Sequence, residues 1–220
     1  MIVEARFNGP PNSGNGGYAA GIFAAAPPAG TGPAEVTLRR PPPLATPLTV
    51  VAGADTTEVR DPDGELVAEV RRVEPFDATV PTVPRATAVE ASADYPGFVD
   101  HPFPTCYVCG PEHPDGLRIF PGRLPDGRTA APFRAPADVT RETVWAALDC
   151  PGGWAVLGAG RPYVLGRIAA VVEAVPAPGD ECVVTGRLLG TDGRKALAHS
   201  TLYGADGSRL GHARATWIAV

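Results

Sequence analysis

Two short stretches of the sequence carry residues that could act on a carbonyl group or on water. The first is NGGYAAG, in which Gly16 and Gly17 open an apolar, alanine-rich segment that predicts a helix. Glycine inside a helix costs roughly 0.5–1 kcal/mol relative to alanine, so an adjacent pair needs a reason. Because a helix start offers unpaired N–H groups and glycine has no Cβ, a carbonyl oxygen could approach these amides closely. The alternative is that the pair only lets the helix pack tightly against a sheet.

The second stretch is VWAALDCPGGW, which contains Asp149. Val144, Trp145 and Leu148 would share one face of a helix, so the carboxyl group of Asp149 lies at a helix end beside buried surface. In that position it can orient or deprotonate a water molecule. The alternative is that Asp149 caps the following turn through hydrogen bonds to backbone N–H groups.

Other polar residues add little to these two stretches. Asn15 could orient a carbonyl group or its water, but Asn12, Ser13 and Asn15 are also ordinary helix caps. His199 and His212 fall in strand-like runs, and no order of serine, histidine and acid suggests a covalent nucleophile.

The four cysteines predict neither a metal site nor a disulfide framework. Cys106 and Cys109 form a CxxC pair, and a structural zinc site needs four ligands. No second paired spacing is found among the remaining candidates, which are His101, His113, Cys150 and Cys182. We therefore expect reduced thiols, a turn at the CxxC pair, no metal and no cofactor.

Composition and charge narrow the class of protein. A chain of 220 residues with 44% hydrophobic and 20% charged residues can bury a substantial core. A net charge of −5 and a single lysine, Lys195, argue against nucleic acid as a partner. No apolar run reaches the ~18 residues of a membrane span, and MIVEARF is unlike a secretory leader, so we expect a cytoplasmic protein without membrane partners.

Two similar halves must position the candidate residues. The sequence predicts an N-terminal repeat over 1–74, a proline-rich linker over 75–105 and a C-terminal repeat over 106–220. Each repeat predicts one helix followed by antiparallel strands. The helices are expected at 16–26 and about 139–149, and the strands at 35–39, 48–52, 56–60, 65–73, 164–175, 181–189, 195–203 and 209–219.

The two halves also share local motifs. NGGYAAGIF in the first half is matched by PGGWAVLG in the second, which contains Gly152 and Gly153. Asp-Gly pairs at 63–64 and 206–207 mark equivalent hairpin turns. An internal duplication of a helix and a strand meander is therefore predicted, giving an α+β protein.

The order of these motifs resembles the double-hotdog proteins of the acyl-CoA thioesterase II type. The resemblance rests on NGGYAAGIFA followed by VTLRRPPPLATPLTV, on VWAALDCPGGWAV, and on the closing segment RKALAHSTLYGADGSRLGHARATWIAV. A further segment, CYVCGPEHPDGLRIFPG, is similar to the opening of many single-hotdog thioesterase-like proteins. The resemblance implies a double hotdog, with two antiparallel sheets that each wrap one helix and pack side by side.

The resemblance also implies roles for particular residues. Asp149 falls on the catalytic aspartate of that family, and Thr216 falls where the family has a glutamine that helps to hold the attacking water. Thr185 is the nearest residue to the family's serine or threonine partner. The glycines expected to bind substrate are Gly16, Gly17, Gly152 and Gly153, and the arginines that could meet CoA phosphates, or be only solvated edge charges, are Arg39, Arg40 and Arg167.

The function expected from these residues is hydrolysis of an acyl-CoA or acyl-carrier thioester at a site between the two halves. Asp149 would activate water, and the helix-start amides of Gly16 and Gly17, with Asn15, would polarise or orient the carbonyl group. A non-catalytic acyl-thioester-binding protein is the alternative, and a hotdog hydratase ranks last. A monomer suffices for such a site, although sheet edges can also pair two copies into a homodimer.

Overall fold

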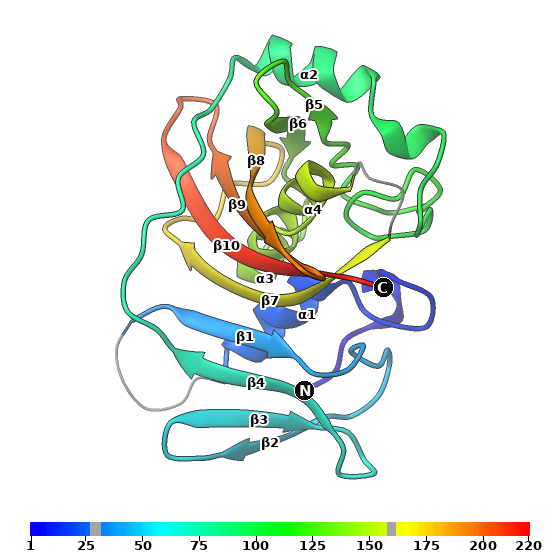
Figure 1. Ribbon diagram of the computed structural model, residues 1–220, viewed down its shortest axis with the longest axis vertical. Helices are drawn as coiled ribbons and strands as arrows, with labels where there is room; N and C mark the ends of the chain where they lie inside the picture. Colours follow the sequence, from blue (N-terminus) through cyan, green and yellow to red (C-terminus); the bar gives the residue numbers. More distant parts are fainter. Residues whose placement is uncertain (27–31, 158–161) are drawn as a thin grey trace.

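The computed structural model describes residues 1–26, 32–157 and 162–220 (Figure 1). Within these residues ten strands form one antiparallel sheet in the order β2-β3-β4-β1-β7-β10-β9-β8-β6-β5. The strands are β1 Ala34–Leu38, β2 Thr49–Ala52, β3 Thr56–Arg60, β4 Leu66–Arg72, β5 Gly122–Arg123, β6 Thr129–Arg134, β7 Tyr163–Val172, β8 Glu181–Asp192, β9 Lys195–Tyr203 and β10 Arg209–Ala219.

The same residues contain four α-helices and two short 3₁₀ turns. The helices are α1 Gly16–Ala24, α2 Arg85–Ala93, α3 Arg141–Ala147 and α4 Cys150–Val156, and the turns are η1 Ala5–Phe7 and η2 Pro96–Phe98. Figure 1 shows α1, α3 and α4 within the curve of the sheet, whereas α2 lies beside β5 and β6. The predicted α+β class is confirmed. No helix in the described part of the chain has the length and apolar character needed to cross a membrane.

The two halves join edge to edge through β1 and β7. Ala34 pairs with Ala170 and Val36 with Ile168, so the two expected sheets lie side by side and continue into each other. This pairing also brings the helix of the first half against the helices of the second, because α1 packs on α3. The first half therefore contributes directly to the surroundings of α3 and α4.

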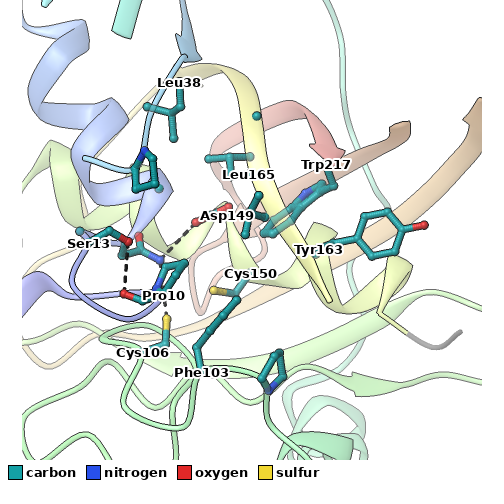
Figure 2. Close-up of a pocket in the computed structure, with 18 of the residues that line it drawn as sticks. Pro10, Ser13, Leu38, Phe103, Cys106, Asp149, Cys150, Tyr163, Leu165 and Trp217 are labelled. Carbon is teal, nitrogen blue, oxygen red and sulfur yellow. Dashed lines mark hydrogen bonds between the residues drawn. The ribbon is translucent and has the colours of Figure 1, made fainter. Parts of the chain in front are cut away.

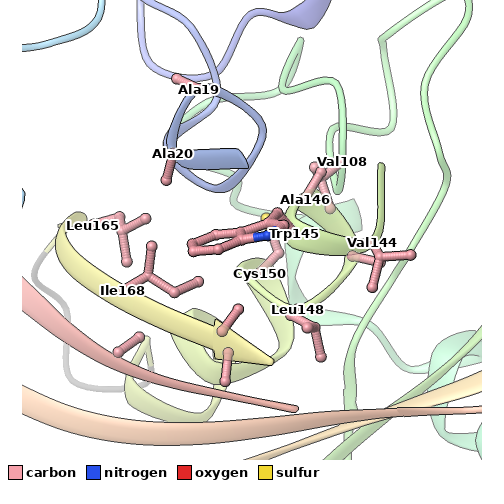
Figure 3. Packing of buried hydrophobic residues seen from close by; sticks show 14 of the residues in the cluster. Ala19, Ala20, Val108, Val144, Trp145, Ala146, Leu148, Cys150, Leu165 and Ile168 are labelled. Carbon is pink, nitrogen blue, oxygen red and sulfur yellow. The ribbon is translucent and has the colours of Figure 1, made fainter. Parts of the chain in front are cut away.

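The hydrophobic core lies between these helices and the sheet. Trp145 of α3 is buried between α1 and β7, beside Ala20 and Ile168 (Figure 3). A Cβ added at Gly21 would lie 3.0 Å from the Cβ of Trp145, so only a residue without a side chain lets α1 come this close. Small residues in α1 therefore serve helix–helix packing as well as the site at its start.

Most predicted strands are present, but several elements differ from the sequence expectation. The helix expected at 139–149 ends at Ala147, and the Pro-Gly-Gly segment that predicted a break forms α4 instead. Proline suits the first turn of a helix because its missing N–H would have no partner there. The strand β6 was not predicted because Pro132 interrupts its pattern. The sheet tolerates this proline because β5 pairs only with Thr129 and Ala130 of β6, so β5 needs no N–H from residue 132.

The segment expected as a linker packs against the sheet. It contains α2, and its residues Ala78 and Val80 bond to side chains of β9 and β10. The N–H of Val80 donates to Thr201 Oγ1 at 2.8 Å, and the hydroxyl of Tyr203 donates to the carbonyl of Val80 at 2.8 Å. The N–H of Ala78 donates to Nδ1 of His212 at 3.3 Å. The connection between the halves is thus anchored by buried polar side chains.

The anchor at His212 predicts a pH dependence of stability. Burial, and then the positive charge of Arg209, lower the pKa of His212 below its ordinary value of 6.5, while Glu173 and Asp77 oppose the shift. The folded state therefore takes up this proton less readily than the unfolded state. The contribution of His212 to stability is therefore fully present above the pKa that this histidine has in the unfolded state. It is lost as the pH falls below that value.

We expect His212→Gln to reduce this loss, because a glutamine carbonyl can still accept the Ala78 N–H but does not titrate. The measurement is the free energy of unfolding in urea, for wild type and variant, at about pH 8 and about pH 5.5. The wild type should lose more stability between the two conditions. Equal losses would show that His212 does not contribute to the acid sensitivity.

Candidate active site

The start of α1 meets the junction between α3 and α4, and the meeting point is the carboxylate of Asp149. The N–H of Gly17 donates to Asp149 Oδ2 at 2.9 Å, and Asn15 Nδ2 donates to the same oxygen at 3.2 Å. Asn15 also caps α1, because its Oδ1 accepts the N–H of Tyr18 at 2.8 Å. The structure therefore brings together three of the predicted site residues from opposite halves of the chain.

Side chains of the sheet hold the α3–α4 junction in place. The hydroxyl of Ser200 in β9 donates to the carbonyl of Leu148. The hydroxyl of Thr129 in β6 donates to the carbonyl of Pro151 at 2.8 Å. These bonds satisfy buried backbone carbonyls on both sides of Asp149. The backbone that carries the carboxylate is therefore held by side chains of the sheet.

The carboxylate of Asp149 is buried and only half satisfied. Its residue is 2% exposed, and its side chain makes no capping hydrogen bond to α4, so the capping role considered for it does not apply. Oδ1 is buried without a partner among the described residues. Burial raises the pKa of Asp149 to about 7; the Gly17 N–H lowers it, Cys106 raises it, and Asn15 lowers it.

A cavity of about 290 Å³ lies beside this carboxylate (Figure 2). Asn15, Gly16 and Asp149 line it together with apolar and aromatic side chains from both halves. The larger of these side chains are Leu38, Phe103, Trp154, Leu157, Tyr163, Leu165, Trp217 and Ile218. The site is therefore an apolar chamber with a small polar wall, which is the usual form of a small-molecule site.

Trp217 contributes a second unsatisfied polar atom to this chamber. Its Nε1 is buried and has no hydrogen-bond partner within the part of the chain that the structure describes. The chamber is thus lined by one residue with an unused acceptor, Asp149, and one with an unused donor, Trp217. Buried polar atoms are normally paired, so two unpaired atoms on residues that line one cavity are unusual.

The glycine pair is used differently from the sequence expectation. The N–H of Gly17 is already bonded to Asp149, so it is not a free donor for a substrate carbonyl in this structure. A Cβ at Gly17 would lie 2.5 Å from the Cβ of Asp149, which explains why residue 17 is glycine. Gly16 lines the cavity, and no bond from its N–H is found within the described residues. The expectation of two free amides is therefore reduced to one.

Other predicted site residues divide into those that line the cavity and those that do not. Gly153 lines it and packs on the Trp217 ring, whereas Gly152 does not line it and lies against Ala198 of β9. Thr216 does not line it, although Trp217 and Ile218 do, and the pairing of β10 with β7 shifts register between Thr216 and Trp217. Thr185 donates to a linker carbonyl instead. Gly152, Thr216 and Thr185 therefore lie outside the lining of this cavity.

Two of the three candidate arginines line the cavity. Arg39 and Arg40 do so with exposed side chains that pair with Glu69 and Glu65, respectively. Arg167 does not line it, and its guanidinium bonds to Thr37 on β1. Positive charge therefore remains at one side of the chamber, although each of the two arginines already has an acidic neighbour.

The cavity also reaches a group of three cysteines. The sulfur atoms of Cys106, Cys109 and Cys150 all lie within 4.8 Å of one another, and all three residues are buried and free. Hydrogen bonds from the thiols of Cys109 and Cys150 hold the pKa of Cys106 well below its ordinary value. The sequence analysis considered all three cysteines but did not predict this group, because Cys150 lies 41 residues after Cys109 on another element.

The aromatic lining is the part of the site that sequence reasoning missed. Phe103 comes from the segment expected as a linker, Trp154 comes from α4, and Trp217 adjoins the residue that was expected instead. The available signal was the alternation along β10, in which neighbouring residues face opposite sides of the sheet. It identifies two possible faces but does not say which one meets the helices.

No protein-family model and no curated protein matches the chain. A hotdog-fold protein of unknown function from Alicyclobacillus acidocaldarius is 18% identical and matches over 100% of this chain and 91% of its own, with a TM-score of 0.61. A candidate thioesterase from Novosphingobium aromaticivorans is 18% identical over 99% of this chain and 93% of its own, with a TM-score of 0.62. The tesB protein of Mycobacterium avium subsp. paratuberculosis is 15% identical over 96% of this chain and 89% of its own, with a TM-score of 0.60. These likenesses show that the chain has the hotdog fold.

The close approach of Gly17 to Asp149 predicts that Gly17→Ala destabilises the protein by about 1–3 kcal/mol, because the new methyl group has no space. Gly190→Ala is the matched control, since a Cβ at Gly190 meets nothing within 4 Å. Its free energy of unfolding should stay within about 0.5 kcal/mol of wild type. Urea unfolding of both variants measures the difference, and equal stabilities would contradict the packing described for Gly17.

Proposed function

We propose that this protein is an acyl-thioester hydrolase in which Asp149 acts as general base. The observation that carries the proposal is the asymmetric carboxylate: Oδ2 is held by Gly17 and Asn15, whereas Oδ1 is left unpaired on a residue that lines an apolar cavity. A base must be oriented by one set of contacts and free at the atom that takes the proton. Asp149 meets both conditions.

The reaction needs a water molecule and a polarised thioester carbonyl. Asp149 Oδ1 takes a proton from water as the water oxygen attacks the carbonyl carbon. The carbon–sulfur bond then breaks, and the proton passes to the leaving thiolate, so that one carboxylic acid and one thiol are released. The start of α1 at Gly16 carries partial positive charge toward the carbonyl oxygen, and the unpaired Nε1–H of Trp217 supplies a donor to the bound water.

The shape and charge of the cavity suit an acyl-CoA. Its apolar and aromatic walls suit an acyl chain, and the guanidinium groups of Arg39 and Arg40 are placed to meet phosphates outside it. An acyl-carrier thioester has the same reacting group and remains within the proposal. The likeness to a tesB protein and to a candidate thioesterase over almost the whole chain supports the double-hotdog assignment and this reaction class.

A second function, acyl-thioester binding without hydrolysis, is favoured by two observations. The Gly17 N–H, which was expected to polarise the substrate carbonyl, donates instead to Asp149. Thr216, expected to hold the water, does not line the cavity. A protein that keeps the chamber without turning over its ligand would have this arrangement, and the variants below separate the two functions.

We expect Asp149→Asn to lower kcat for acyl-CoA hydrolysis by about 10²- to 10⁴-fold, because an amide cannot accept the proton of water. The asparagine carbonyl can still accept the Gly17 N–H, so the fold should be retained. The measurement is thiol release from a panel of acyl-CoAs of different chain length. Asp94→Asn, at an exposed aspartate after α2, is the matched control and should leave turnover unchanged.

Acyl-CoA binding by the wild type without any thiol release would reject the hydrolase and establish the binding protein. Turnover in Asp149→Asn at the wild-type rate would likewise remove Asp149 from the mechanism. Addition of water to an enoyl-CoA would instead identify a hydratase. This reaction is measured by the loss of absorbance from the conjugated double bond.

The two roles of Asn15 can be separated by substitution. Asn15→Ser keeps a good helix cap but removes the Nδ2 donor to Asp149. We expect stability close to wild type and turnover reduced by about 10- to 100-fold, because the carboxylate is less well oriented. Asn15→Ala should also lose about 1 kcal/mol of stability. If Asn15→Ser retains full activity, Asn15 is only a cap.

A further inference from the structure

The proposed hydrolysis does not use the three cysteines beside the cavity. Cys106 and Cys109 come from an irregular segment, and Cys150 is the first residue of α4. Their sulfur atoms lie within 4.8 Å of one another, and the residues are 4%, 4% and 5% exposed. Three thiols from two distant segments of the chain are therefore buried together.

The turn between Cys106 and Cys109 places their two sulfur atoms close to the sulfur of Cys150. Asn15 Nδ2 donates toward the sulfur of Cys106 at 3.7 Å. A Cβ at Gly110 would lie 2.3 Å from the backbone nitrogen of Cys106, so only glycine allows the chain to turn this tightly. The thiolate is the form of cysteine that binds metal.

The segment that carries the pair has little other regular structure. Residues 101–121 contain neither helix nor strand, yet Tyr107, Val108 and Ile119 of this segment are part of the core. A link between this segment and α4 would fix the wall of the cavity next to Asp149. Metal coordination provides such a link where hydrogen-bonded elements do not.

We propose that Cys106, Cys109 and Cys150 bind one zinc ion through three thiolates, with the fourth coordination position directed toward the cavity. Zinc–sulfur bonds of about 2.3 Å place the sulfurs of a tetrahedral site about 3.8 Å apart, so small side-chain shifts suffice. The thiol protons pass to solvent as the ion binds. Soft thiolate ligands select zinc over the harder magnesium and calcium ions.

His101 supports the sulfurs and is not itself assigned as a ligand. Its Nδ1 accepts the N–H of Phe103 at 2.8 Å, so the proton of the neutral ring is on Nε2. Nε2 donates toward Cys109, with the carbonyl oxygen at 3.2 Å and the sulfur at 3.4 Å. A disulfide is a poorer account of the group, because it would join two of the three sulfurs and leave one buried thiol over.

The test is the zinc content of the full-length chain after loading with zinc and removal of the excess by desalting. We expect one zinc per chain in the wild type, and close to none in Cys106→Ser and Cys150→Ser. Cys182→Ser is the matched control, because Cys182 is a buried free cysteine in β8 outside the group. It should bind zinc like the wild type, as should His101→Ala.

Cobalt binding gives a readout that does not depend on whether the serine variants fold. Wild-type protein loaded with cobalt should show an intense sulfur-to-metal charge-transfer band with the strength of three thiolates. A folded wild type that takes up no zinc, or a cobalt complex without that band, would overturn the site. Loss of zinc in His101→Ala would overturn the three-thiolate ligand set. None of these outcomes depends on whether the cavity hydrolyses thioesters.

Discussion

The hydrogen bonds between the start of α1 and the carboxylate of Asp149 are the constraint on which the site depends. A buried carboxylate is costly unless donors surround it, and both of its donors among the described residues come from the opposite half of the chain, at 2.9 and 3.2 Å. To supply them, α1 must lie directly on the α3–α4 junction. Residue 17 must then be glycine, because a side chain would occupy the position of the carboxylate.

The incomplete pairing of this carboxylate is what gives the cavity a chemical character. Oδ2 is held while Oδ1 has no partner in the described part of the chain, and the neighbouring Trp217 carries an unpaired donor. Most of the remaining lining is apolar. In such surroundings a polar atom gains more from a bound water or carbonyl than it would in solvent, since little else competes for it.

The α3–α4 junction places two kinds of chemistry on consecutive residues. Asp149 faces the start of α1, and Cys150 joins the two cysteines of the irregular segment that begins the second half. Bonds from Ser200 and Thr129 hold the backbone between them. A junction fixed in this way couples the position of the carboxylate to that of the thiols, so that order in one supports order in the other.

The sequence by itself determined the α+β class, and it predicted two repeated helix-and-strand halves and the candidate site residues Asn15, Gly17 and Asp149. These follow from local features: alternation along strands, Asp-Gly turns, helix-start composition and an acid beside an apolar helix face. The tertiary structure alone decided which atoms meet. It directed the Gly17 N–H to Asp149, turned Trp217 rather than Thr216 toward the helices, and brought Cys150 to the CxxC pair. Such contacts join residues distant in the chain, and neither residue spacing nor local period specifies them, because a register change of one residue reverses the face of a strand.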